Sequence, residues 1–229
     1  MENCAKLREH IIKHGAYSSE KNAEIYEVWF ARSPRYLFRE VDRAYGISRK
    51  LLCDIGCAYG QNLPHCREGS YGIEIDAERA EFIRSIGYQV YEHDVDKDDI
   101  SHLPPAEVVW CSAVLEHMES PYGLLRKIYD LLQSGGLVVL YVPVIPVWSF
   151  LEKAPGLGRY VTGYDRPGHV HAFVPSTLRY LCEQAGFITL KVSPCYPGFF
   201  RIFEYLPWFN RLTGRCIYVG RKDFGRNVR

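Results

Sequence analysis

The chain has 229 residues, a length typical of one large α/β domain with additions. Hydrophobic residues make up 47% of it and charged residues 24%, which is the composition of a globular protein with a sizeable core. The formal net charge of +1 gives no electrostatic case for a nucleic-acid partner, because such a partner usually requires a basic face.

Cysteine usage and hydropathy restrict the cellular setting. The eight cysteines are scattered without a Cys-x-x-Cys pair, which favours a reducing cytoplasm over a disulfide framework or a zinc site. The N-terminus lacks the apolar core of a signal peptide. The stretch from Leu131 to Leu151 carries no charge and is long enough to cross a membrane, but glycines 135–136 and two prolines interrupt it. We therefore expect a helix end, a buried strand and a loop there, and no transmembrane segment.

The first 47 residues are predicted to form an N-terminal helical cap. Residues 20–46 have helical character, Pro34 suits a first helical turn after the N-cap Ser33, and Gly46 suits a helix end. Residues 48–229 then form the main domain.

An alternation of strands and helices predicts the fold of that domain. Apolar strands end in turns and are followed by helices, as in the helix over 121–133, which Gly135 and Gly136 are expected to stop. A short helix is expected after Gly60, and Asp76 is the expected N-cap of the next helix. The expected parallel strands are 50–55, 71–75, 88–92, 106–111 and 137–142.

The C-terminal part completes the sheet. Pro175 opens a helix that Gly186 ends, and strands 187–193 and 215–220 follow without an obvious crossover helix between them. Two such strands form an antiparallel edge pair. The predicted fold class is α/β, a Rossmann-like doubly wound sheet of seven mostly parallel strands with an antiparallel last strand.

A glycine turn after the first strand predicts a nucleotide-type cofactor site. Gly56 and Gly60 allow a sharp turn and close approach of a ligand, and backbone N–H groups after the turn are expected to be free to bind it. Asp54 ends the first strand and can orient the loop or accept from a ligand ammonium group. Glu74 ends the second strand, where it can accept both hydroxyls of a ribose. The alternative is a tight turn that binds nothing.

Further candidates follow the third and fourth strands. Asp94 and Val95 can bracket an adenine, with the carboxylate facing its exocyclic amine, and two small residues close the site after the fourth strand. The full set of candidate cofactor-binding residues is Asp54, Gly56, Cys57, Ala58, Gly60, Glu74, Ile75, Asp94, Val95, Ser112 and Ala113.

In these and several neighbouring segments the chain resembles the class I S-adenosylmethionine-dependent methyltransferases. The segments that carry the resemblance are 54–60 (DIGCAYG), 72–76 (GIEID), 112–117 (SAVLEH), 132–136 (LQSGG) and 168–178 (GHVHAFVPSTL). They resemble most the small-molecule branch that includes the ubiquinone-biosynthesis-type enzymes. The resemblance implies S-adenosylmethionine as the cofactor, held by residues of the candidate set.

Two positions depart from the family pattern. Ala58 stands where many members have a middle glycine, and its small side chain is expected to be tolerated. Ubiquinone-type O-methyltransferases can carry Glu-x-x-Glu-His as a metal site, but here the first position is Ala113, so only Glu116 and His117 of that motif are present. We therefore expect no metal.

Histidines are the candidate catalytic residues. His117 follows the fourth strand, and an imidazole suits the general base that a hydroxyl acceptor needs, which favours O-methylation. His169 and His171 flank Val170 and can bind the acceptor or remove its proton. The alternatives are a turn cap for the Glu116-His117 pair and a loop anchor for the second histidine pair.

The acceptor side is expected in the insertion 143–174 and in the aromatic segment 194–212. Tyr164, Asp165 and Arg166 suit either a clamp for a polar acceptor or a solvated turn. The aromatic segment, with Trp148 and Phe150, suits a lid over a hydrophobic or aromatic small molecule, a homodimer face, a membrane-surface patch or plain packing.

The predicted function is S-adenosylmethionine-dependent methylation of a small molecule. A catalytically silent, methyltransferase-like partner subunit is one alternative, and an eroded glycine turn would favour it, whereas Gly56, Gly60 and Glu74 are intact. A nicotinamide-dependent oxidoreductase is another, and it requires Gly-x-Gly-x-x-Gly and a Tyr-x-x-x-Lys pair that the chain does not place correctly.

Overall fold

A computed structural model describes residues 2–14, 20–31, 35–145, 168–194 and 214–224. The chain divides into two compact units. Unit 1 comprises Met1–Asp98 and Ala106–Val108, and unit 2 comprises Asp99–Pro105 and Val109–Arg229.

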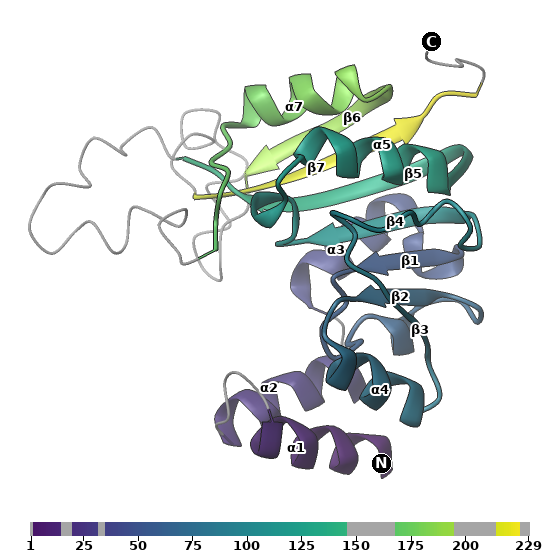
Figure 1. Cartoon of the computed structure of the whole chain (residues 1–229), viewed down its shortest axis with the longest axis vertical. Coiled ribbons are helices and arrows are strands. Elements are labelled where there is room, and N and C mark those ends of the chain that lie inside the picture. The colour runs from purple at the N-terminus through teal and green to yellow at the C-terminus, as the bar shows by residue number, and fades with distance from the viewer. Residues whose placement is uncertain (1, 15–19, 32–34, 146–167, 195–213, 225–229) are drawn as a thin grey trace, which may run out of the picture. The chain divides into compact units, whose positions relative to one another are not determined.

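Seven strands have the hydrogen-bonded order β3-β2-β1-β4-β5-β7-β6 (Figure 1). This order, with an antiparallel β7, confirms the predicted seven-stranded Rossmann-like fold. The strands are β1 (Leu52–Ile55), β2 (Tyr71–Glu74), β3 (Gln89–Glu92), β4 (Ala106–Ser112), β5 (Leu132–Pro143), β6 (Phe187–Pro194) and β7 (Arg215–Lys222).

Three parallel strands form the sheet of unit 1. Ile55 of β1 lies opposite Ile73 of β2, and Glu74 of β2 lies opposite Glu92 of β3. All four residues of β1 and all four of β2 are buried. Such strands need apolar side chains on both faces, and their carboxyl ends meet at one edge. Helix α4 (Ala77–Ser85) follows β2, and Asp76 caps it as predicted, with its side chain accepting from the backbone N–H of Arg79 at 3.0 Å.

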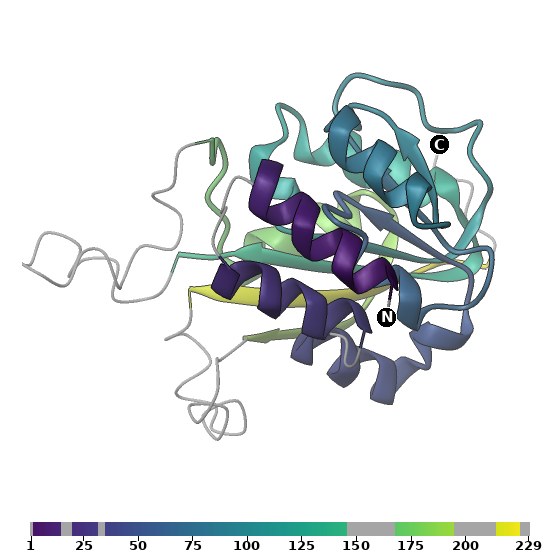
Figure 2. The same cartoon turned by 90° about the horizontal axis from the view of Figure 1, so that it is seen from below.

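The N-terminal part of unit 1 is helical, with α1 (Glu2–His14), α2 (Glu20–Ala31) and α3 (Tyr36–Tyr45). Helices α1 and α2 lie side by side (Figure 1, Figure 2). Gly46 ends α3 in the left-handed conformation, as predicted. Ser33 and Pro34 lie outside the described residues, and the boundary at residue 47 stays a prediction. The shared core contains Leu7, Ile11, Ala23, Phe30, Tyr59, Leu63, Phe82 and Ile83, together with smaller residues.

Unit 2 contains the antiparallel strands and helices α5 (Pro121–Leu131) and α7 (Pro175–Gln184) (Figure 1). Strand β7 is antiparallel to both β5 and β6, which confirms the predicted C-terminal pair and adds that β7 is its inner strand. Tyr129 of α5 meets Phe187 of β6 edge to face, with 5.3 Å between the ring centroids.

Two predicted helices differ from the structure in extent. The short helix expected after Gly60 is the three-residue 3-10 turn Leu63–His65, which ends where Cys66 takes an extended conformation. The helix expected to reach residue 133 ends at Leu131. Strand β5 begins at the next residue, and Lys222 donates to the carbonyl of Leu132 at 2.6 Å, so the chain leaves the helix before the glycine pair.

Ala58 has a φ of +52°, a left-handed conformation that costs an alanine about 1–2 kcal/mol. Glycine avoids that cost but loses more chain entropy on folding. We expect Ala58→Gly to raise the free energy of unfolding by about 0.5–1 kcal/mol in urea denaturation. Ala80→Gly, in the interior of α4, serves as the control and should lower it by about 1 kcal/mol. Equal destabilisation by both changes would contradict the strain at residue 58.

In the part of the chain that the structure describes, none of the helices combines the length and apolar character that crossing a bilayer requires.

Candidate functional site

Glu74 connects the end of β2 to the glycine turn. Its side chain is 5% exposed. One carboxylate oxygen accepts from the backbone N–H of Ala58 at 2.8 Å, and the other accepts from that of Asp76 at 3.2 Å. Burial raises the pKa of Glu74, although these two hydrogen bonds oppose the rise. Each oxygen keeps a second lone pair, so the carboxylate can also accept from ribose hydroxyls.

Asp54 lies near the end of β1 and is 3% exposed. Asn62 donates to it from Nδ2 at 2.9 Å. Burial raises the pKa of Asp54 to about 7, and the negative charge of Glu74 acts in the same direction, whereas Asn62 and the charge of Arg35 oppose it. A buried carboxylate with little compensation attracts a cation, which fits the ammonium group of an amino-acid ligand.

The backbone of the glycine turn is engaged within the protein. The N–H groups of Gly56 and Cys57 donate to the carbonyl of Ile73 at 2.8 and 3.2 Å, and that of Gly60 donates to the carbonyl of Cys57. The tight turn therefore uses these three N–H groups to close, and the expectation of free donors concerns the residues that follow the turn and stays a prediction. Cys57 is buried, and its Sγ fills the space above Gly72, where a Cβ would lie 2.4 Å from the sulfur.

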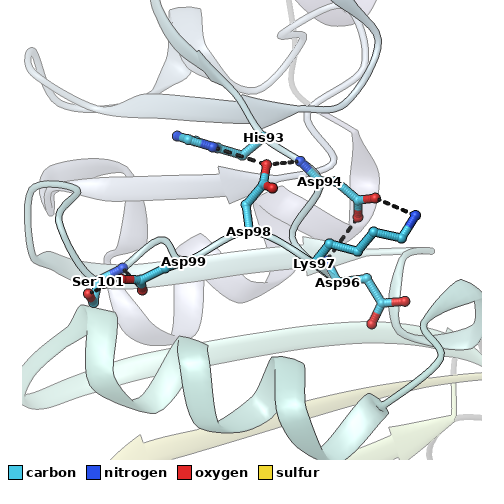
Figure 3. A network of polar contacts seen from close by, with 7 residues as sticks. All are labelled: His93, Asp94, Asp96, Lys97, Asp98, Asp99 and Ser101. Atoms are coloured by element: carbon cyan, nitrogen blue, oxygen red, sulfur yellow. Dashed lines mark hydrogen bonds and ion pairs between the residues drawn. The ribbon is translucent and has the colours of Figure 1, made fainter.

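The segments after β2 and β3 hold the remaining candidates of unit 1. Ile75 is 64% exposed, an unusual exposure for a large apolar residue that a ligand base could cover. Val95 is buried. Asp94 accepts from the backbone N–H of Asp96 at 3.1 Å and pairs with Lys97 at 3.1 Å (Figure 3). An adenine amine at Asp94 would compete with the Lys97 ammonium.

In unit 2, Ser112 ends β4 and Ala113 follows it. Ser112 is half-buried, whereas Ala113 is exposed and has a φ of +57°. The backbone N–H of Ala113 donates to the carbonyl of Tyr141 at 2.8 Å, which joins this turn to β5.

The same unit brings together Glu116, His117 and His169, which we call the Glu116 group. Glu116 is 1% exposed, and its Oε1 lies 3.9 Å from Nε2 of His169. The two imidazole rings meet edge to face with 4.8 Å between centroids. Nδ1 of His117 lies 2.8 Å from the carbonyl oxygen of Gly168. Both predicted catalytic histidines therefore belong to one cluster. His171 is outside it and lies beside Phe173.

Comparison with known proteins shows the family. The family described as "Methyltransferase domain" matches residues 29–192, which is more than half of the chain. The chain belongs to this family. The match confirms the predictions of an enzyme of the methyltransferase class and of S-adenosylmethionine as its cofactor.

Solved structures share the fold of this methyltransferase. An S-adenosylmethionine-dependent methyltransferase from Mesorhizobium loti is 19% identical, with a TM-score of 0.59 over 80% of this chain and 96% of that chain. One from Archaeoglobus fulgidus is 20% identical, with a TM-score of 0.57 over 87% and 99%. A chain of the complex that contains the Haloferax volcanii Trm112 methyltransferase activator is 14% identical, with a TM-score of 0.61 over 97% and 98%.

A short segment also resembles a curated protein. Over 34 residues the methyltransferase is 53% identical to a tRNA U34 carboxymethyltransferase from Desulforapulum autotrophicum. The match spans 15% of this chain and 10% of that protein, so it concerns a small part of both.

One polar residue of the methyltransferase, Asn62, and one contact, between Glu116 and His169, escaped prediction. Asn62 lies eight residues after Asp54, and only its polar side chain in a tight turn hinted at a role. The burial of Glu116 against His169 joins residues 53 apart in the chain, a contact that no local pattern reveals. The predicted acceptor residues Trp148, Phe150, Tyr164, Asp165 and Arg166 and most of the aromatic segment 194–212 lie outside the described residues.

Proposed function

We propose that the protein transfers a methyl group from S-adenosylmethionine to a hydroxyl of a small molecule. The observation that carries the cofactor half is the buried carboxylate pair at the ends of β1 and β2, Asp54 and Glu74, in a chain of the methyltransferase domain family. Asp54 takes the ammonium group and Glu74 the ribose. The other proposed contacts in unit 1 are Gly56, Cys57, Ala58, Gly60, Ile75, Asp94 and Val95.

The hydroxyl half rests on His117. Methyl transfer to an alcohol or phenol requires loss of the hydroxyl proton, and an imidazole is a suitable base. The Gly168 carbonyl cannot donate, so Nδ1 of His117 carries the proton in that hydrogen bond and Nε2 keeps its lone pair in the neutral ring. The ring is exposed and can meet an acceptor. The protein then supplies alignment and proton removal, while the sulfonium supplies the driving force.

The small-molecule class rests on charge. A net charge of +1 lacks the basic surplus that nucleic-acid partners usually require. An RNA acceptor is the second candidate, because the 34-residue match belongs to a tRNA-modifying enzyme. We also propose a cytoplasmic location, since all seven cysteines among the described residues are free thiols.

The first experiment measures binding and transfer separately. Calorimetry of the full chain should detect S-adenosylmethionine and its demethylated product. Labelled methyl transfer should then be measured to a panel of small alcohols, phenols and amines, with bulk tRNA in parallel. Transfer to tRNA alone would contradict the small-molecule proposal, and binding without any transfer would favour the silent subunit. No binding at millimolar cofactor would remove the whole proposal.

Replacing His117 tests its role as the base. His117→Ala should lower turnover by about 10²-fold or more with a hydroxyl acceptor, because general-base catalysis contributes factors of this size. Affinity for the demethylated cofactor should change less than threefold, about 0.7 kcal/mol. His102→Ala, elsewhere in unit 2, is the matched control. Equal losses of turnover and affinity would indicate a structural role for His117.

A further inference from the structure

The Glu116 group has the composition of a metal-ion site. One donor atom from each of Glu116, His117 and His169 lies within 4.8 Å of the other two. Two of these residues come from the segment after β4, and the third comes from a segment 52 residues further along the chain. Two imidazoles and one carboxylate are a donor set that first-row divalent ions with an affinity for nitrogen prefer.

The carboxylate of Glu116 lacks adequate compensation for its burial. Its side chain is 1% exposed, and Oε2 has no hydrogen-bond partner among the described residues. Oε1 lies 3.9 Å from Nε2 of His169, which is too long for a direct hydrogen bond. Burial raises the pKa of Glu116, although a backbone hydrogen bond and the charge of His117 oppose the rise. Oε2 has no hydrogen-bond partner among the described residues, and a cation placed between the carboxylate and the imidazoles would reduce the cost of its burial.

The surrounding backbone holds the donors in place. The N–H groups of Val170 and His171 both donate to the carbonyl of Glu116, at 3.0 and 3.1 Å. The Nδ1–H of His117 donates to the carbonyl of Gly168 at 2.8 Å. Histidine ligands of metal ions commonly donate their second ring N–H to a backbone carbonyl in this way, which directs the other nitrogen to the ion.

From this geometry we propose that Glu116, His117 and His169 bind a divalent transition-metal ion, with Zn²⁺ as the best match. Zinc binds nitrogen at about 2.0–2.1 Å, so tetrahedral donors lie about 3.4 Å apart. The group therefore closes by about an ångström when it binds the ion. Three protein donors leave at least one position for water or an oxygen ligand. The sequence predicted no metal because Ala113 occupies the first motif position, and His169 is a donor that the motif does not contain.

The test titrates Zn²⁺ into metal-free full-length protein against a chromophoric chelator. We expect one equivalent to bind, and Glu116→Gln and His169→Asn each to weaken binding by at least about tenfold. Bound Co²⁺ should give visible bands typical of nitrogen and oxygen ligands in a four-coordinate site. His171→Asn and Glu119→Gln are matched controls, since neither residue belongs to the group, and they should bind zinc like the unchanged protein.

Three results would overturn the proposal. They are the absence of stoichiometric binding, an equal loss of binding in His171→Asn, and a thiolate-to-cobalt band that places the ion on cysteine. Thermal unfolding and binding of the demethylated cofactor are measured for every variant, so that a misfolded variant is recognised. If Glu116→Gln misfolds, Glu116→Asp, which keeps the carboxylate, takes its place in the titration. The inference goes beyond the proposed function. Bound zinc would occupy the Nε2 lone pair of His117, so in the zinc-loaded protein His117 would hold the ion and would not act as the base. Because Glu74→Gln should weaken cofactor binding at least tenfold without affecting zinc, cofactor binding and zinc binding can fail independently.

Discussion

Replacing Glu74 by glutamine should weaken binding of the demethylated cofactor by at least tenfold, about 1.4 kcal/mol or more. A carboxylate forms charge-assisted hydrogen bonds with ribose hydroxyls that are roughly twice as strong as those of a neutral amide. Glutamine also turns one acceptor into a donor. That donor faces the backbone N–H of either Ala58 or Asp76, so residue 74 loses one of its two hydrogen bonds from the backbone. Calorimetry on the full chain measures the change.

Glu78→Gln is the matched control, because Glu78 lies four residues later in the first turn of α4 and is exposed. It should bind the cofactor with unchanged affinity. If Glu74→Gln also bound with unchanged affinity while folding normally, Glu74 would serve only to hold the turn, and the ribose would have to be sought elsewhere in the chain.

The strands were predictable because their signals are local. Buried parallel strands such as β1 and β2 appear in the sequence as short, mostly apolar runs with an acidic residue at or next to their ends. The Asp76 cap lies one residue before its helix. The pair β6 and β7 was predictable because the sequence between them shows no obvious pattern of a crossover helix. The tight turn after β1 was predictable from Gly56 and Gly60, which both have positive φ angles, whereas the positive φ of Ala58 was not, because alanine disfavours that conformation.

The site was predictable only where chemistry follows strand ends. Glu74 and Asp54 were found because the carboxyl ends of β1 and β2 share one sheet edge. Their contacts were not, since Asn62 reaches Asp54 across the glycine turn from eight residues later, and His169 lies near Glu116 although it belongs to a distant segment. A sequence motif identifies a functional residue, but it does not show which side chain from another segment lies beside that residue in the fold.

Asp54→Asn should stabilise the free protein at alkaline pH and, at the same time, weaken binding of the cofactor. The folded protein raises the pKa of Asp54 to about 7, chiefly through burial, from about 3.9 in an unfolded chain. Between these pH values the folded protein holds a proton that the unfolded chain has released. The free energy of unfolding therefore falls as pH rises through this window and is level above it. Three pH units correspond to about 4 kcal/mol, an upper limit for the gain in the asparagine variant.

Cofactor affinity should follow the opposite course. The ligand ammonium selects the ionised carboxylate, so affinity in the unchanged protein should fall by up to tenfold per pH unit below about pH 7. Asp54→Asn, which can still accept from Asn62, should bind at least tenfold more weakly at about pH 8 and lose most of this pH dependence. The pKa of Glu74 is also raised, so the pH dependence of affinity that remains in Asp54→Asn measures the contribution of Glu74. Denaturation and calorimetry across the same pH range provide both curves.

Replacing a carboxylate that only supported the fold would not weaken ligand binding. A carboxylate that only bound the ligand would not destabilise the free protein. Opposite changes in stability and affinity therefore identify Asp54 as a buried charge that the fold tolerates because the cofactor neutralises it. A flat affinity curve in the unchanged protein would contradict this role.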